Sequence, residues 1–294
     1  MSAPSTPSPD PADARKPRDS EIDVYGLTHP GKLRKENQDH FLIASLAKQM
    51  IVHRTSLPDD AALPREPERL AFLAMVADGV GSGAGEEASR MAVQSISRYV
   101  ARSTHTYYAS DAADAADADR FTELLQDAAM ECHAAVLEAG GQDARRSMAS
   151  TLTLWIGMWP RSYLLQVGDS RCYIYWDGKL TQISRDQTMA QALVDQGVLT
   201  HTKAYSTRWA HVLASAIGGS QAAPVVTPFY QRWGLIGLLC SDGLTKHVPD
   251  ERIAERLAAM TSAKQVCEDL LQDALDGGGS DNITVLVGRT VKRD

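Results

Sequence analysis

The chain has 294 residues, and 44% of them are hydrophobic, which is enough to bury a sizeable core. Its formal net charge is −7, with 37 acidic against 30 basic residues. Because nucleic-acid binding normally needs a basic surface, this balance argues against nucleic acid as a partner. It leaves phosphate binding at one local site open.

The cysteines and the apolar segments bear on the compartment. The four cysteines are too far apart for a zinc site, and their spacing does not suggest a disulfide framework. No apolar stretch approaches the ~18 residues of a membrane span, and the N-terminus lacks the apolar core of a signal peptide. We therefore predict a soluble, cytoplasmic protein with buried, reduced thiols at Cys132, Cys172, Cys240 and Cys267.

The first half of the chain begins with a segment that cannot form a core. Residues 1–20 are rich in Pro, Ser, Asp and Ala, which predicts a disordered tail, and residues 21–294 are expected to form a single domain. Apolar patterns then predict strands and two helices, the first with acidic residues in its opening turn and the second ending at a Gly-Gly pair. The expected strands are 22–31, 39–45 and 70–79, and the expected helices are 85–103 and 121–141.

The second half switches to a period of two residues, which is typical of strands. An Asp-Gly pair at 177–178 suits a two-residue hairpin turn. Helices inserted in pairs between strands favour an α+β fold built on antiparallel sheets over a doubly wound parallel fold. Strands are expected at 150–159, 161–170, 171–184, 233–243 and 280–291, helices at 186–200, 249–260 and 262–275, and residues 200–219 fit neither pattern.

Aspartates recur where buried strands begin or end. Asp78 and Asp242 each precede a glycine at the end of such a strand, Asp281 follows a glycine run before another, and Asp39 enters a fourth. Taken alone, each is a turn residue. If the strand ends are neighbours, the carboxylates raise one another's pKa, and a pair could share a proton. Three or four would more naturally hold a divalent cation, Mg²⁺ or Mn²⁺ rather than zinc.

Six segments in order carry a resemblance to a known family. They are GKLRKENQDHF, VADGVGSGAGEEAS, MASTLTL, VGDSRCYIYWDGKLTQISRDQT, LCSDGLTKHV and GGSDNITVLV, within a match that runs from about Tyr25 to Val287. Together they resemble the PPM-type (type 2C) metal-dependent serine/threonine protein phosphatases. The resemblance implies a four-layer α-β-β-α sandwich, in which two antiparallel β-sheets are flanked by helices.

The resemblance also implies a two-metal site. Asp78 matches the residue that bridges both ions, and the Gly79 carbonyl matches a ligand of one of them. Asp242 and Asp281 match the ligands that complete the other ion's shell. The ions are expected to be Mn²⁺ or Mg²⁺, two per site.

Further residues match positions around the metals. Gln38 and Asp39 match positions that hold metal-bound waters, with Gln38 where many relatives have Glu. Arg34 matches the arginine that grips the substrate phosphate, for which a guanidinium fork is suited. Arg34 and Asp39 are thus the expected catalytic side chains, and Asn282 is expected to brace Asp281. No side chain is assigned as the acid that protonates the leaving group.

The implied reaction is hydrolysis of phosphoserine and phosphothreonine esters. Two metals lower the pKa of a bridging water, which attacks phosphorus in line without a covalent enzyme intermediate. The implied partners are phosphorylated proteins in signal transduction, among them a Ser/Thr kinase. Two alternatives stay open: a catalytically weak regulator that binds phosphoproteins, and a hydrolase of small phosphate esters.

Other positions depart from the family pattern or invite a structural interpretation. Where many relatives carry an aspartate for a third metal, this chain has Arg145 and Arg146, with Asp143 close by, which leaves a third ion in question. Asp169 is expected to cap the hairpin or to pair with Arg171. Residues 196–219, with Arg208 and His211, correspond to the family's variable flap and are a candidate for substrate choice.

Overall fold

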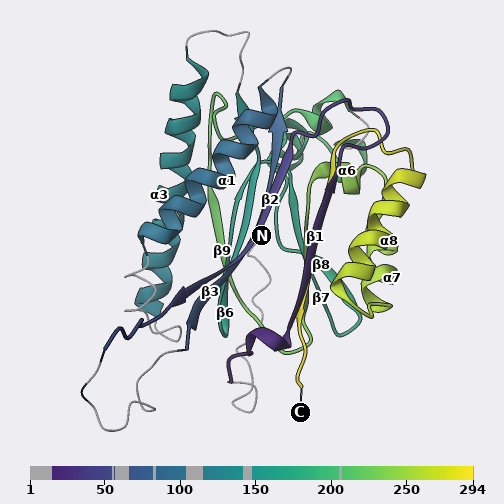
Figure 1. The fold of residues 1–294 in the computed structure, drawn as a ribbon. Helices are drawn as coiled ribbons and strands as arrows, with labels where there is room; N and C mark the ends of the chain where they lie inside the picture. The colour runs from purple at the N-terminus through teal and green to yellow at the C-terminus, as the bar shows by residue number, and fades with distance from the viewer. Residues whose placement is uncertain are drawn as a thin grey trace.

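The computed structural model describes residues 15–54, 56, 66–81, 84–103, 115–141, 148–204 and 207–293, with the backbone alone at 115–117, 201 and 202. Its elements form four layers, with helices on both outer faces of two stacked sheets (Figure 1). The helices α1 (Gly85–Arg102) and α3 (Ala115–Gly140) cover one sheet, and α7 (Asp250–Ala258) and α8 (Ala263–Asp276) cover the other. This arrangement confirms the predicted α-β-β-α sandwich.

Every neighbouring pair of strands in the two sheets is antiparallel. The first and last strands of the chain pair with each other, which brings the two ends of the folded sequence together. One sheet has the order β1 (Ile22–His29), β11 (Ile283–Thr290), β10 (Ile236–Cys240), β7 (Arg171–Trp176) and β8 (Lys179–Gln182). The other has the order β2 (Asp39–Lys48), β3 (Glu68–Val80), β5 (Leu152–Met158), β6 (Arg161–Val167) and β9 (Val225–Tyr230), with β4 (Ala149–Ser150) pairing with β3.

Three apolar layers hold the sandwich together. Trp155 and Leu286 belong to the layer between the two sheets. Ile96 belongs to the layer under α1 and α3, and Leu270 to the layer under α7 and α8. All residues of β5 are buried, so the apolar residues Leu154, Trp155 and Ile156 follow one another without exposed residues between them.

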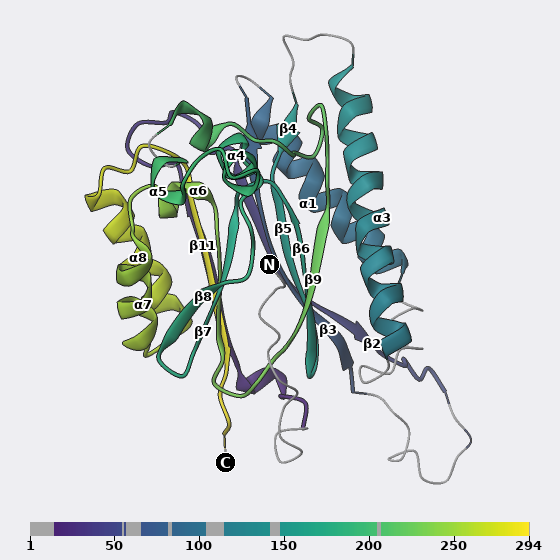
Figure 2. The ribbon, with the colours of Figure 1, turned by 180° about the vertical axis from the view of Figure 1, so that it is seen from behind.

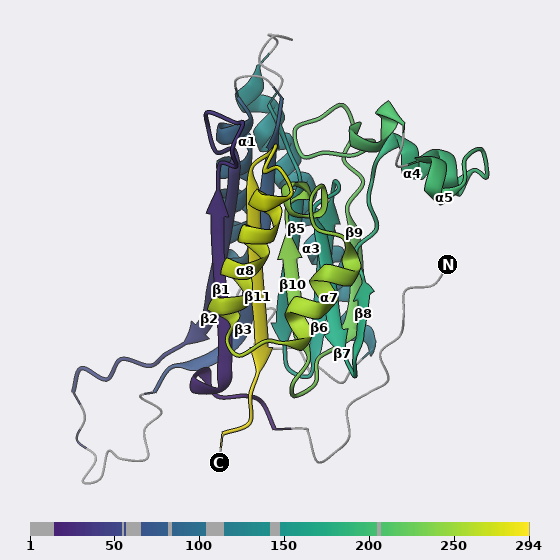
Figure 3. The same ribbon diagram turned by 90° about the vertical axis from the view of Figure 1, so that its right-hand side faces the viewer.

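One strand and the details of one segment were not predicted. Strand β9 contains Pro228, which cannot donate to a ladder, but β9 lies at the edge of its sheet, where proline is tolerated. The predicted helix 186–200 is shorter, as α4 (Met189–Asp195). The unassigned segment contains α5 (His201–Ala204) and the 3₁₀ turn η3 (Arg208–His211). In Figure 3, α4 and α5 project beside the sandwich at one end.

The predicted disordered tail lies largely outside the described residues. From residue 15 onward the chain contacts the sandwich, since Lys16 donates to the backbone carbonyl of Arg69 and Arg15 pairs with Glu21. That residues 21–294 form a single domain stays a prediction. The four cysteines are buried and form no disulfide, as predicted. In the described part of the chain, no helix has the length and apolar character needed to cross a bilayer.

The strand ends that carry the predicted ligands lie at one end of the sandwich. The start of β2 lies beside the end of β3, with Asp39 directly opposite Asp78. In the other sheet the start of β11 lies beside the end of β10, which leads into the short helix α6 (Asp242–Thr245). Figure 2 shows α6, α4 and β4 grouped at this end.

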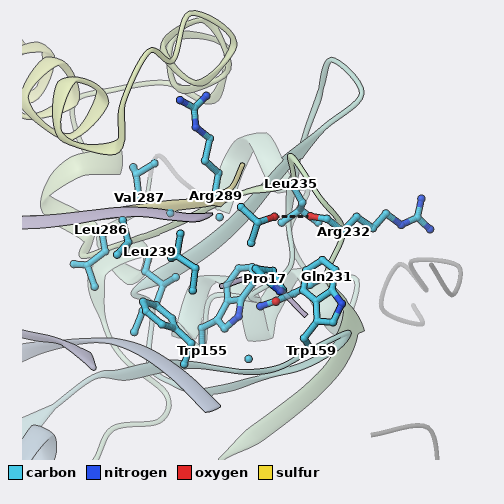
Figure 4. Close-up of a pocket in the computed structure, with 18 of the residues that line it drawn as sticks. Pro17, Trp155, Trp159, Gln231, Arg232, Leu235, Leu239, Leu286, Val287 and Arg289 are labelled. Atoms are coloured by element: carbon cyan, nitrogen blue, oxygen red, sulfur yellow. Dashed lines mark hydrogen bonds between the residues drawn. The ribbon is translucent and has the colours of Figure 1, made fainter. Parts of the chain in front are cut away.

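A pocket opens between the sheets toward the other end of these strands. Its volume is about 90 Å³, and its lining includes Trp155, Trp159, Gln231 and Leu235 (Figure 4). Gly237 on β10 faces Trp155 across the two sheets, and a Cβ built there would lie 2.6 Å from the indole Cζ3. The spacing of the sheets at this point therefore depends on a glycine.

Replacing Gly237 with alanine should destabilise the sandwich. We expect the free energy of unfolding to fall by about 1–3 kcal/mol, because the Trp155 ring must move out of a packed position. Gly288, the register partner of Gly237 on β11, is a matched control, since a Cβ there would lie 3.4 Å from the nearest atom. Urea unfolding of Gly237→Ala and Gly288→Ala measures the difference; equal stability of the two variants would contradict the packing argument.

Candidate functional site

The centre of the site is a pair of carboxylates that face each other across two strands. Asp39 on β2 and Asp78 on β3 are directly opposite in the antiparallel register, so their side chains lie on the same face. Like charges in this position repel, and burial strengthens the repulsion. Sequence spacing could not show this register, because Asp39 and Asp78 lie on two different strands that pair only when the chain folds.

Asp39 is held by hydroxyl groups from the other sheet. Ser241, after β10, and Thr284, on β11, both donate to Asp39 Oδ2 at 2.7 Å. The carboxylate therefore bridges the two sheets at this end of the sandwich. Its second oxygen, Oδ1, is buried and accepts no hydrogen bond from the described residues.

Close backbone contacts bring Asp242 next to Asp281. A Cβ at Gly243 would lie 1.8 Å from the carbonyl oxygen of Asn282, so only glycine lets the start of α6 approach the start of β11 so closely. Asp242 Oδ1 is likewise buried without a hydrogen-bond partner among the described residues. The aspartates at the ends of two neighbouring strands thus meet, as the sequence predicts if those strands are adjacent.

Two positively charged side chains contact the carboxylates of Asp242 and Asp281. Lys246 Nζ lies 2.6 Å from Asp242 Oδ2 and 2.6 Å from Asp281 Oδ2. The guanidinium of Arg34 lies on the other side of Asp281, with Nε 2.8 Å from Oδ1 and Nη2 2.9 Å from Oδ2. Arg34 is more than half exposed, whereas Lys246 is largely covered.

Asp169 lies near the same carboxylates. Of the two roles expected for it, a cap of the hairpin or an ion pair with Arg171, the ion pair is wrong. Arg171 forms its ion pair with Asp186, at 2.6 Å, and not with Asp169. Asp169 is buried, and burial together with the nearby charge of Asp242 raises its pKa to about 8. We call Asp39, Asp78, Asp169, Asp242 and Asp281 the acidic cluster.

The pKa values of the cluster show how strongly its members interact. Burial raises the pKa of Asp39 to about 6, although hydrogen bonds from Ser241 and Thr284 oppose the shift. Removal from water, and then the neighbouring charge of Asp39, raise the pKa of Asp78 well above its usual range. Burial acts in the same direction on Asp281, but Lys246 and Arg34 outweigh it and lower the pKa of that carboxyl.

Gln38, Gly79 and Asn282 connect the loop before β2 to the cluster. The Gln38 carbonyl accepts from the Gly79 N–H at 3.0 Å, and a Cβ at Gly79 would lie 2.2 Å from the Gly85 carbonyl oxygen. Asn282 Oδ1 accepts from the Gln38 N–H, and its Nδ2 donates to the carbonyls of Pro30 and Glu36. Asn282 also donates its backbone N–H to Asp281, so it braces both that residue and the loop.

The donor set suits a hard divalent cation. It consists of carboxylate oxygens, two of which are buried and lack hydrogen bonds from the described residues. In the described ranges no three Asp, Glu, His or Cys side chains converge closely enough to hold an ion as they stand. The two cationic side chains contact Asp242 and Asp281, so part of the cluster's charge is already balanced by the protein.

Other predicted residues lie apart from the cluster or outside the described chain. Asp143, Arg145 and Arg146 fall in the segment 142–147, which the structure does not describe. Arg208 and His211 lie on η3, where the Arg208 guanidinium stacks 4.6 Å from the Trp209 ring centroid.

Three features of the site were not predicted from the sequence. Lys246 stands four residues after Asp242, a helical spacing that signals a side-chain pair. Asp169 follows a strand and a glycine, much as the other aspartates lie at strand ends. The hydroxyls of Ser241 and Thr284 carry no such signal, because only the stacking of the sheets directs them at Asp39.

Known proteins are similar to this chain in both sequence and fold. The family model described as protein phosphatase 2C matches residues 49–277. The serine/threonine phosphatase stp of Listeria monocytogenes is 30% identical over 226 residues, which cover 76% of this chain and 84% of that protein. The crystal structure of the catalytic domain of the serine/threonine protein phosphatase PstP in complex with two manganese ions has a TM-score of 0.67 and 27% identity, covering 92% of this chain and 99% of that one.

One relative is much longer than the matched segment. The serine/threonine protein phosphatase PstP of Mycobacterium tuberculosis is 41% identical over 147 residues, which are 50% of this chain but only 28% of that protein. The match of the family model nevertheless spans most of the chain, and the Listeria relative aligns over most of its own length. The chain belongs to the protein phosphatase 2C family.

Proposed function

We propose that the protein is a metal-dependent serine/threonine protein phosphatase. The observation that carries this proposal is that Asp39, Asp78, Asp242 and Asp281 lie near one another at one end of the sandwich. Asp39 and Asp242 each have one buried carboxylate oxygen that lacks a hydrogen-bond partner among the described residues. Family membership supports the reaction class, since the Listeria and mycobacterial relatives are named serine/threonine phosphatases. That the PstP catalytic domain binds two manganese ions supports the metal requirement.

In this proposal the ions are held by Asp78, the Gly79 carbonyl, Asp242 and Asp281, with Gln38, Asp39 and Asn282 around them. The oxygen donors fit Mn²⁺ and Mg²⁺ alike. Two bound cations would neutralise charge on the phosphoryl group and make a bound water acidic enough to attack phosphorus in line, without a covalent enzyme intermediate.

The chain's own residues would orient the reactants. Asp39 is fixed through Oδ2 by Ser241 and Thr284, so its Oδ1 can accept a hydrogen bond from a water and direct it. Arg34 has a side chain that is 54% exposed, so the donors that do not face Asp281 are accessible to a substrate phosphate. Planar, charge-assisted contacts of this kind position a phosphate before the reaction.

The substrates we propose are phosphoserine and phosphothreonine residues of proteins in signal transduction, with a Ser/Thr kinase as one candidate partner. Helix α5, which belongs to the candidate flap of residues 196–219, projects at the site's end of the sandwich (Figure 3), and in this proposal the flap contacts the protein part of a substrate. The buried thiols fit a reducing compartment such as the cytoplasm. A weak phosphoprotein-binding regulator and a hydrolase of small phosphate esters are the alternatives that the assays below would reveal.

Hydrolysis of a phosphothreonine peptide should require both metal and Asp78. We expect activity with millimolar Mn²⁺, none after chelation with EDTA, and a loss of at least about 100-fold in Asp78→Asn, because the amide lacks the negative charge with which Asp78 would hold the cations. Phosphate release measures the rate. Asp177→Asn, the same substitution at an exposed hairpin turn with φ of 50°, is the control and should retain full activity.

Inactivity of folded wild type with both Mn²⁺ and Mg²⁺ would contradict the catalytic proposal for this substrate. Phosphopeptide binding without turnover would then favour the regulator. Faster hydrolysis of a small phosphate ester than of the peptide, at equal concentrations, would favour the small-ester hydrolase.

Replacing Arg34 with lysine should weaken substrate binding more than turnover. Lysine keeps the charge but cannot form the paired hydrogen bonds of a guanidinium, so we expect KM for the phosphopeptide to rise about tenfold with a smaller change in kcat. Arg98→Lys, on the exposed face of α1, should leave both constants unchanged. Steady-state kinetics test this; an unaltered KM in Arg34→Lys would remove Arg34 from the phosphate site.

A further inference from the structure

Lys246 lies between two carboxylates of the acidic cluster. Its ammonium lies between Asp242 and Asp281, at 2.6 Å from one carboxylate oxygen of each. These residues come from the ends of two different strands, β10 and β11. The lysine therefore joins two of the carboxylates that the proposed metal site requires.

Lys246 carries a positive charge at neutral pH, as lysine side chains ordinarily do. Its ammonium therefore places a charge from the chain itself between two carboxylates of the acidic cluster.

We propose that Lys246 is an internal counter-cation that competes with a divalent ion for Asp242 and Asp281 and so lowers the metal affinity of the site. This inference rests on the proposed function, because it assumes that these two aspartates bind metal. An ammonium and a divalent ion repel each other, so contact of both with the same carboxylate oxygens at short distance is unfavourable. Departure of Lys246 from those oxygens then favours binding of the ion.

The structure gives the lysine a way to leave. Its side chain is 22% exposed and ends a short helix at the surface, so rotation about its flexible stem can carry the ammonium into water. Asp242 Oδ1 is not engaged by Lys246 and has no partner among the described residues. One carboxylate oxygen is thus available before the lysine moves, while the other becomes available only afterwards.

The competition also predicts a benefit for the metal-free protein. Without Lys246, Asp242 and Asp281 would repel each other with no cation between them. The lysine therefore stabilises the fold when metal is scarce and weakens metal binding by the same contact, as linkage requires.

Titration with Mn²⁺ tests the proposal without relying on activity. We would measure free Mn²⁺ by electron paramagnetic resonance for wild type, Lys246→Gln and Lys246→Arg at one pH and ionic strength. Loss of the competing charge should strengthen the binding of at least one ion by about tenfold in Lys246→Gln, whereas Lys246→Arg keeps the charge and should stay close to wild type. Lys264→Gln removes an exposed lysine that pairs with Glu268 at the same helical spacing, and it should leave binding unchanged.

Thermal unfolding gives a second measurement. In EDTA, Lys246→Gln should unfold at a lower temperature than wild type, and Mn²⁺ should raise its Tm by more than it raises that of wild type. Lys264→Gln should show neither difference. A cooperative unfolding transition of Lys246→Gln, with a Tm that rises on addition of Mn²⁺, also shows that this variant is folded.

The outcomes separate this inference from the proposed function. Equal Mn²⁺ affinity in wild type and Lys246→Gln would overturn the competition, and so would weaker binding in the variant, which would make the lysine an organiser of the ligands. Both results would leave metal binding itself intact. Failure of every folded variant to bind Mn²⁺ would instead overturn the metal site and the inference together.

Discussion

Repulsion between carboxylates at one end of the sandwich is the constraint around which the site is organised. Asp39 and Asp78 face each other on paired strands, and Asp169, Asp242 and Asp281 add their charges nearby. Such a group is costly to bury unless protons, hydrogen bonds or cations balance it. The hydroxyls of Ser241 and Thr284 solvate one oxygen of Asp39, and Lys246 and Arg34 neutralise the Asp281 side.

Apolar packing in the rest of the fold offsets the unfavourable free energy of burying such a cluster of carboxylates. Three apolar layers hold the two sheets and their helices together, and they extend along the strands away from the charged end. Glycines permit the contacts on which the cluster depends, since any side chain at Gly79 or Gly243 would collide with backbone atoms. Rigid strands therefore present the carboxylates, while the loop before β2 is tied to them by Asn282.

Charge balance connects stability with the proposed chemistry. A cluster fully neutralised by its own lysines and arginines would be stable but would have no need of a metal, whereas a bare cluster would bind metal tightly and fold poorly without it. This chain lies between the two cases. Lys246 and Arg34 contact two of the carboxylates, whereas Asp39 and Asp242 each keep an oxygen without a partner among the described residues.

The sequence by itself determined the class of fold and predicted the chemical type of the site. Apolar runs, a hairpin turn at Asp177-Gly178 and helices in pairs indicated antiparallel sheets covered by helices, and aspartates at strand ends indicated an all-oxygen site. Strand β9 escaped prediction because Pro228 is tolerated only at the sheet edge, which local sequence does not reveal.

Only the tertiary structure decided which groups meet. The register that sets Asp39 against Asp78 and the hydrogen bonds from Ser241 and Thr284 to Asp39 each join residues far apart in the chain. Spacing along a sequence specifies contacts within a helix or a hairpin. Contacts between sheets depend instead on how the apolar faces stack, and that stacking is a property of the whole folded chain.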